Sequence, residues 1–69
     1  MKFIKFDFGD EKYELINLSS IQAVRVKNNE IVIRSTNSES YYYNSQEEAR
    51  NYIKNFDEVK ELLLKISGN

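Results

Sequence analysis

The stretch AVRVKNNEIVIRS, residues 23–35, decides the fold, because two runs rich in β-branched residues flank a pair of asparagines. Asparagine tolerates the positive φ angles that a tight two-residue turn requires, so Asn28-Asn29 predicts a β-hairpin. A loop of these two residues alone sets four cross-strand pairs: Lys27 with Glu30, Val26 with Ile31, Arg25 with Val32, and Val24 with Ile33. This register gathers aliphatic side chains on one face and places opposite charges at the tip.

The turn after this hairpin decides where three adjacent tyrosines point. The next predicted strand is SYYYN, residues 40–44, and the turn segment TNSES, residues 36–40, leads into it and shares Ser40 with it. A turn with an even number of residues places Tyr42 on the aliphatic face, and Tyr41 and Tyr43 on the opposite face. A three-residue turn reverses these positions. We favour the even turn, because it leaves one face wholly apolar for a covering helix.

A long amphipathic helix is predicted over residues 46–67. The segment SQEE at 45–48 matches a capping box, in which the serine hydroxyl and the last glutamate satisfy free amides at the helix start. Apolar residues then recur three or four positions apart, as Ala49, Tyr52, Phe56, Val59, Leu63 and Ile66, with Ile53 and Leu62 beside them. Asp57 could instead cap a second helix after a break at Asn55-Phe56, but the unbroken stripe favours one helix.

Two further predicted strands precede the hairpin. KFIKFDF at 2–8 alternates apolar and charged residues, and KYELINL at 12–18 follows a Gly-Asp turn. Ser19-Ser20 interrupts the chain before the hairpin strands, which we place at 21–27 and 30–36. The predicted fold is therefore α+β. It is a four- or five-stranded antiparallel meander followed by one long C-terminal amphipathic helix packed on one sheet face, in a single domain covering 1–69.

The composition excludes several classes of site. The chain has 69 residues with no Cys and no His, so neither a disulfide nor a typical zinc site is expected, and no other metal or cofactor is indicated. Ten basic residues against 11 acidic ones give a net charge of −1, which does not favour nucleic acid as a partner. No long apolar run or signal-peptide pattern is present, so we expect a cytoplasmic protein without membrane contact.

Catalysis is not expected. Without histidine the usual base for a nucleophilic serine is missing, and a domain of this size rarely forms a deep cleft. An acidic cluster surrounds the first turn, but it lacks the spacing of a calcium loop, and we interpret it as solvated: Asp7, Asp10, Glu11 and Glu14. We therefore predict a protein that is not an enzyme.

The favoured register predicts one partner-binding surface, and the helix predicts another. Tyrosines beside arginines suit stacking on a base or gripping a protein, and this face contains Arg25, Lys27, Val32, Arg34, Tyr41 and Tyr43. A helix of about 30 Å extends past a short strand, so its end is predicted to form a homodimer interface. The residues expected there are Leu62, Leu63 and Ile66.

Two resemblances bear on function. YYYNSQEEARNYIKNF is similar to a last strand running into a capped helix, as in the PUR repeats and the positive-cofactor type of transcriptional coactivators. These groups bind single-stranded nucleic acid through dimerising ββββα units. Their sheets are typically basic, whereas the sheet predicted here is neutral. The pattern INLSSIQAV…EIVIRS…YYYNSQEEA also resembles short phage and Gram-positive proteins of strand-meander plus C-terminal helix type, some of which inhibit host defence.

These observations rank two functions. The first is a small non-catalytic protein-binding module, of the kind a phage or mobile element uses to inhibit a host complex such as a CRISPR effector (anti-CRISPR-like). The alternative is a dimeric single-stranded nucleic-acid-binding domain in which Tyr41 and Tyr43 stack on bases, flanked by Arg25, Lys27 and Arg34.

Overall fold

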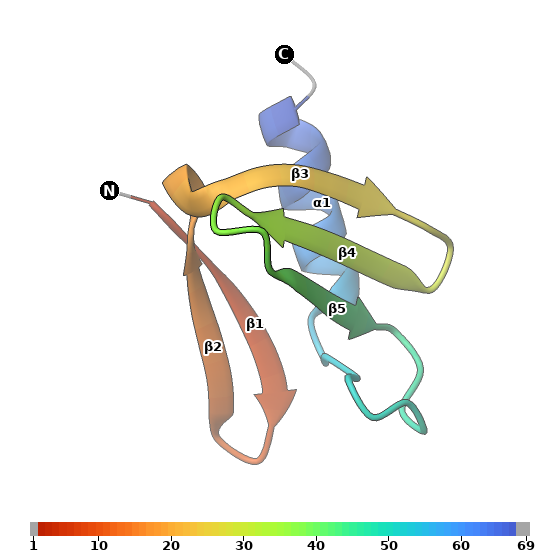
Figure 1. The fold of residues 1–69 in the computed structure, drawn as a ribbon. Coiled ribbons are helices and arrows are strands. Elements are labelled where there is room, and N and C mark those ends of the chain that lie inside the picture. The colour runs from red at the N-terminus through yellow and green to blue at the C-terminus, as the bar shows by residue number, and fades with distance from the viewer. Residues whose placement is uncertain (1, 68–69) are drawn as a thin grey trace.

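The computed structural model describes residues 2–67, which form five strands, a short 3₁₀ helix and an α-helix (Figure 1). In chain order these are β1 (Phe3–Gly9), β2 (Lys12–Asn17), η1 (Leu18–Ser20), β3 (Ile21–Val26), β4 (Glu30–Ser35), β5 (Ser40–Asn44) and α1 (Phe56–Ser67). All strand pairs within the sheets are antiparallel, and α1 follows the last strand. The α+β class is therefore confirmed.

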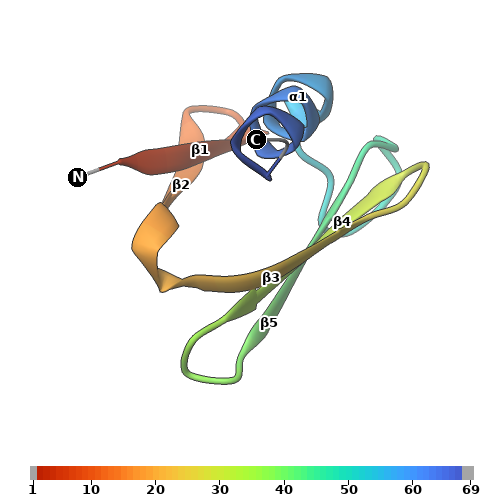
Figure 2. The same ribbon diagram turned by 90° about the horizontal axis from the view of Figure 1, so that it is seen from above.

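The strands form two sheets, so the single meander is a wrong prediction. β1 pairs with β2, whereas β3, β4 and β5 form a separate sheet in that order. Local hydrogen bonds in η1 explain the break: the Asn17 side chain accepts from the Ser19 amide at 2.9 Å, and the Ser20 hydroxyl donates to the Asn17 carbonyl at 2.7 Å. Such bonds favour a tight turn over a continuing strand. Figure 2 shows the two sheets diverging from η1, with α1 in the angle between them.

The hairpin register predicted from the sequence is confirmed. The observed pairs include Val24–Ile33, Arg25–Val32 and Val26–Ile31. At the tip the Lys27 amide donates to the Glu30 carbonyl at 2.7 Å, and the two side chains form an ion pair at 3.6 Å. Ile31 and Ile33 are fully buried on the helix-facing side, whereas Val24 remains 39% exposed near the edge of the sheet.

The turn between β4 and β5 has three residues, which is the less favoured of the two alternatives. The Ser35 amide donates to the Glu39 carbonyl at 2.7 Å, so residues 36–38 form the loop. Ser38 has a φ of 73°, the left-handed conformation that closes a three-residue hairpin loop. The Ser35 hydroxyl also donates to the Asn37 side chain, which orders the turn locally.

The odd loop reverses the tyrosines, so their preferred orientation is wrong. Tyr41 pairs with Ile33 and Tyr43 pairs with Ile31, and all four side chains share the face that α1 covers. Tyr42 lies on the opposite face and is 52% exposed. The sheet face that points away from the helix therefore carries one tyrosine instead of two.

The predicted helix over 46–67 is wrong for its first part, because α1 begins only at Phe56. The alternative placed a break at Asn55-Phe56 between two helices, and the structure has the second of these helices but not the first. Residues 46–55 form turns and an isolated bridge to β5. The expected capping box does not form: the Ser45 hydroxyl instead donates to the Asn29 side chain at 3.2 Å. Helix-start signals in the sequence are thus overridden by contacts with the neighbouring strands.

The segment before α1 connects the two sheets. On one side, the Asn44 amide donates to the Asn51 carbonyl at 2.9 Å. On the other side, the Lys54 amide donates to the Asp7 carbonyl at 2.7 Å. The Asn55 side chain completes the link to β1, because its Oδ1 accepts from the Asp7 amide at 3.0 Å and its Nδ2 donates to a second carbonyl of that strand at 2.8 Å. A segment of turns can make these bonds, whereas a continuous helix through residues 46–55 could not.

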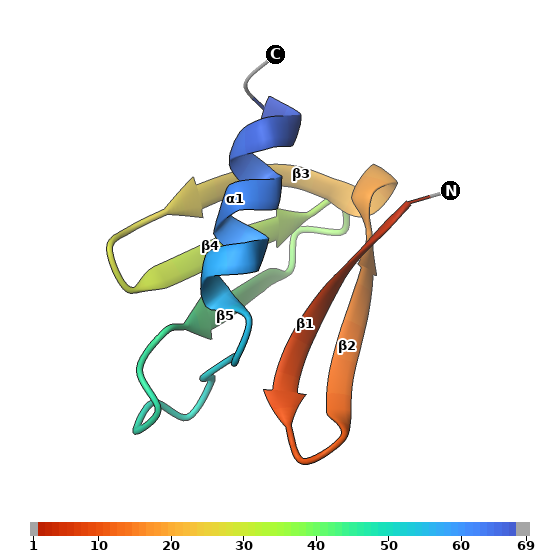
Figure 3. The same ribbon diagram turned by 180° about the vertical axis from the view of Figure 1, so that it is seen from behind.

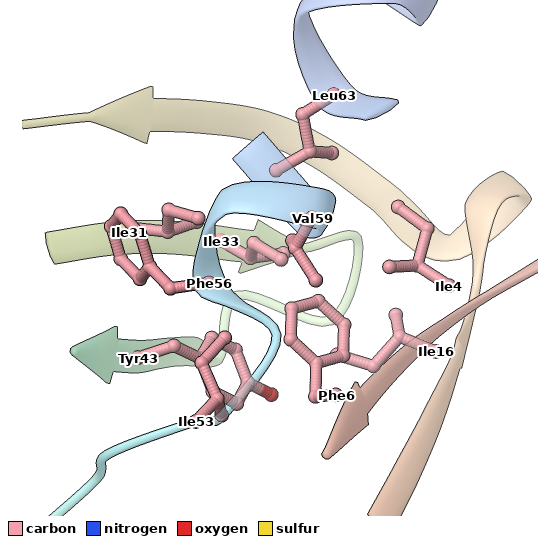
Figure 4. Packing of buried hydrophobic residues seen from close by; sticks show 10 residues of the cluster. All are labelled: Ile4, Phe6, Ile16, Ile31, Ile33, Tyr43, Ile53, Phe56, Val59 and Leu63. Carbon is pink, nitrogen blue, oxygen red and sulfur yellow. The ribbon is translucent and has the colours of Figure 1, made fainter. Parts of the chain in front are cut away.

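The core lies where the two-stranded sheet of β1 and β2, the three-stranded sheet and α1 meet (Figure 4). Its buried members are Ile4, Phe6, Ile16, Ile31, Ile33, Tyr43, Ile53, Phe56, Val59 and Leu63. The rings of Phe6 and Tyr43 stack with centroids 4.2 Å apart, which joins β1 to β5 across the two sheets. From the β5 side, α1 crosses β4 and β3, and its C-terminal end projects beyond β3 (Figure 3).

Candidate functional site

The face of the three-stranded sheet that points away from α1 is covered by no element of residues 2–67 (Figure 1). Its side chains lie in two adjacent rows: Arg25, Val32 and Tyr42 in one, and Ala23, Arg34 and Ser40 in the other. We call these six residues the outer face. They line a shallow hollow of about 280 Å³ together with Val24.

The outer face has an apolar centre with polar groups around it. Val32 lies on the central strand, with Arg25 on one side and Tyr42 on the other. Arg34 is two residues further along the same strand as Val32, so its side chain emerges on the same face. The arrangement places two guanidinium groups and one phenol ring around an aliphatic floor.

The outer face is positively charged. Arg25 and Arg34 are exposed, and neither forms an ion pair with any residue that the structure describes. Lys27, which the sequence placed in the same surface, lies at the hairpin tip and is paired with Glu30 at 3.6 Å. Its charge is therefore partly neutralised, and the two arginines are the cations available to a ligand.

Tyr41 and Tyr43, the two tyrosines predicted for this surface, lie on the other side of the sheet. Tyr43 is only 3% exposed, and its hydroxyl donates to Glu14 of β2 at 2.6 Å. The Tyr41 hydroxyl donates to Glu39 at 2.8 Å. Tyr43 therefore cannot stack on a ligand at the outer face and instead joins the two sheets.

Burial, together with the hydrogen bond to Glu14, raises the pKa of Tyr43 well above its usual range. The unfolded chain loses this proton near pH 10, whereas the folded chain retains it. The contribution of the protonated Tyr43 to stability is thus fully present below pH 10. Above pH 10 the free energy of unfolding falls by up to about 1.4 kcal/mol per pH unit.

Replacing Tyr43 with Phe tests this coupling. At neutral pH we expect Tyr43→Phe to lower the free energy of unfolding by about 1 kcal/mol through the lost hydrogen bond. Above pH 10 the wild type should lose stability more steeply than the variant, in urea unfolding measured from pH 7 to the alkaline range. Tyr42→Phe, which removes an exposed hydroxyl, should follow the wild type. Equal slopes for wild type and Tyr43→Phe would contradict the assignment.

The three residues predicted as a dimer interface are not equivalent. Leu63 is 6% exposed and belongs to the core, whereas Leu62 and Ile66 are 38% and 51% exposed. Ile66 lies beside β3, where it lines a groove of about 510 Å³ with Leu63 and residues of that strand. Only the exposed pair is available for contact with another molecule without unfolding.

The sequence reasoning missed an exposed apolar surface on the two-stranded sheet of β1 and β2. Phe3, Tyr13 and Leu15 are each at least half exposed on the face of β1 and β2 that points away from the core. The Lys5 ammonium lies 4.8 Å from the centre of the Tyr13 ring, as a cation–π contact. The alternation of Tyr13 and Leu15 with Glu14 and a buried isoleucine is the signal that could have revealed it.

The stretch 2–67 contains no group of three or more acidic, histidine or cysteine side chains arranged to hold a metal ion. It also contains no helix with the length and apolarity needed to cross a membrane.

No protein-family model, curated protein or solved structure matches this chain.

Proposed function

We propose that the protein is a small non-catalytic module that binds an acidic segment of another protein through the outer face. The observation that supports this most directly is the pair Arg25 and Arg34, both exposed and without an ion-pair partner among the described residues, beside the exposed ring of Tyr42. Arginine and tyrosine are the residue types that dominate binding energy at protein interfaces. An inhibitor of a host complex would act through the same surface, by covering acidic groups that the complex needs.

A protein partner fits this surface better than a single-stranded nucleic acid does. Proteins that bind single-stranded nucleic acid without sequence preference stack bases on several aromatic rings along a basic groove. The outer face offers one ring, that of Tyr42. The net charge of −1 provides little long-range attraction for a polyanion. The aliphatic floor at Val32 suits an apolar side chain of a peptide, with carboxylates held by the arginines.

Peptide-display selection on the immobilised protein, at physiological salt, tests the proposal. We expect enrichment of sequences that combine Asp or Glu with apolar residues. Fluorescence anisotropy with the enriched peptide should then show about 10-fold weaker binding, or more, for the double variant Arg25→Ala/Arg34→Ala, because charged hydrogen bonds each contribute about 1.5–3 kcal/mol.

The matched control is Arg50→Ala/Lys65→Ala, which removes the same charge from exposed positions outside the outer face. This control should bind the peptide as the wild type does. The proposal fails if no acidic sequence is enriched, or if both double variants lose affinity equally. Tighter binding of a labelled oligonucleotide than of any peptide would instead favour the nucleic-acid hypothesis.

A further inference from the structure

The projecting end of α1 and the edge of the sheet enclose an apolar groove that no described element fills. Its volume is about 510 Å³, and its walls include Ile21, Val24 and Val26 of β3 together with Leu63 and Ile66 of α1. None of the described residues that line it is charged. Because no charged group marks this surface, it suits another apolar surface and not a charged ligand.

An open strand edge runs along the same groove. β3 is the outermost strand of its sheet, with β4 on one side only. The Lys27 amide points toward β4, where it donates to Glu30, and the alternation of an antiparallel ladder directs Arg25 the same way. The backbone groups of Val24 and Val26 therefore point away from β4. Open edges of this kind are templates for pairing with another strand.

The chain exposes more surface than a folded monomer of its size is expected to expose. The chain exposes 5203 Å², whereas a folded monomer of 8.2 kDa is expected to expose about 4500 Å². The difference of about 700 Å² approaches the ~800 Å² that each partner buries in a standard protein interface. A partner of this chain's own size could cover that area.

We propose that a second copy of this chain fills the groove, with the two β3 edges paired antiparallel about a two-fold axis. A second copy presents the same edge and the same apolar wall, as a two-fold interface requires. A register centred on Val24 sets Arg25 opposite Ala23 of the other copy. Centring on Arg25 would instead bring two guanidinium groups together, which is unfavourable. Pairing at Val24 joins the two outer faces into one sheet surface.

Sedimentation equilibrium over a micromolar to millimolar range tests the pairing without reference to any ligand, so its outcome is independent of the proposed peptide binding. We expect the wild type to approach twice the mass of the 8.2 kDa chain. Ile66→Glu should weaken dimerisation by about 10-fold or more, because it places a carboxylate in the apolar interface. Leu15→Glu is the matched control, since Leu15 is 52% exposed on the hairpin and Ile66 is 51% exposed in the groove.

Val24→Pro tests the strand edge separately. The Val24 amide points away from β4, so proline should remove a hydrogen bond to the second copy while the bonds between β3 and β4 remain. Circular dichroism and urea unfolding check that each variant is folded. A wild type that stays at 8.2 kDa at all concentrations overturns the proposal, as does a Leu15→Glu effect equal to that of Ile66→Glu. A folded Val24→Pro variant that dimerises like the wild type overturns the edge pairing.

Discussion

Replacing Phe6 with Ala should remove a large part of the protein's free energy of unfolding and lower its urea midpoint. Phe6 is fully buried, and its ring stacks on that of Tyr43 with an interplanar angle of 17°. Removing a buried phenylalanine ring costs about 3–5 kcal/mol, because packing is lost and a cavity remains. A domain of 69 residues has a free energy of unfolding of roughly 3–10 kcal/mol, so this single change removes much or all of it.

The same strand supplies the control for this prediction. Phe3 lies on the opposite face of β1 and is 50% exposed, so Phe3→Ala should change the free energy of unfolding by about 1 kcal/mol or less. Urea unfolding followed by far-ultraviolet circular dichroism measures both variants. A Phe6→Ala protein whose unfolding midpoint stays near that of the wild type would show that the contact between the two sheets contributes little to stability.

The position of Tyr43 depends on two turns, and the sequence predicted only the first of them correctly. The length of the turn at Asn28-Asn29 fixes which residues of β3 and β4 face each other. A two-residue turn was predicted there, and the predicted pairs are the observed ones. In the next turn no glycine marks the left-handed position, which Ser38 occupies with a φ of 73°. Nothing in the local sequence distinguishes three loop residues from two or four. One residue of difference moved Tyr43 from the expected binding surface into the core.

The first part of the predicted helix failed for a different reason. The residue spacing there suits a helix, but the segment instead forms turns in which Ile53 is the one buried residue. The choice depends on partners far away in the sequence. Asn55 bonds to β1, 48 and 50 residues away, and helix propensity is a weak preference beside such tertiary contacts. A periodic pattern alone could not reveal these bonds.

The candidate binding surface was predictable in part. Arg25, Val32 and Arg34 were placed together correctly, because their positions depend only on the hairpin register. The aromatic member was wrong, because it depends on the ambiguous turn, and Tyr42 takes the place of its neighbours. Division into two sheets was not foreseen either, since it arises from the hydrogen bonds of η1. These bonds use side chains that are equally common in ordinary turns.

Leu63→Glu should cause the second largest loss of stability. It also distinguishes a core role for Leu63 from the role in a dimer interface that the sequence predicted. Leu63 is 6% exposed and continues the buried stripe of Phe56 and Val59 on α1. A glutamate here must either bury an unpaired carboxylate or pull the last turns of α1 away from the sheet. Burial of an unpaired charge costs several kcal/mol, which is comparable with the whole stability of the domain.

The neighbouring residue makes the comparison sharp. Leu62 is 38% exposed on the same helix turn, so Leu62→Glu introduces the same charge where water can solvate it. We expect Leu62→Glu to retain a cooperative urea transition within about 1 kcal/mol of the wild type, and Leu63→Glu to show none. If Leu63→Glu instead stays folded and only changes the oligomeric state, Leu63 is an interface residue. The core would then depend on Phe56 and Val59 alone to hold α1 against the sheet.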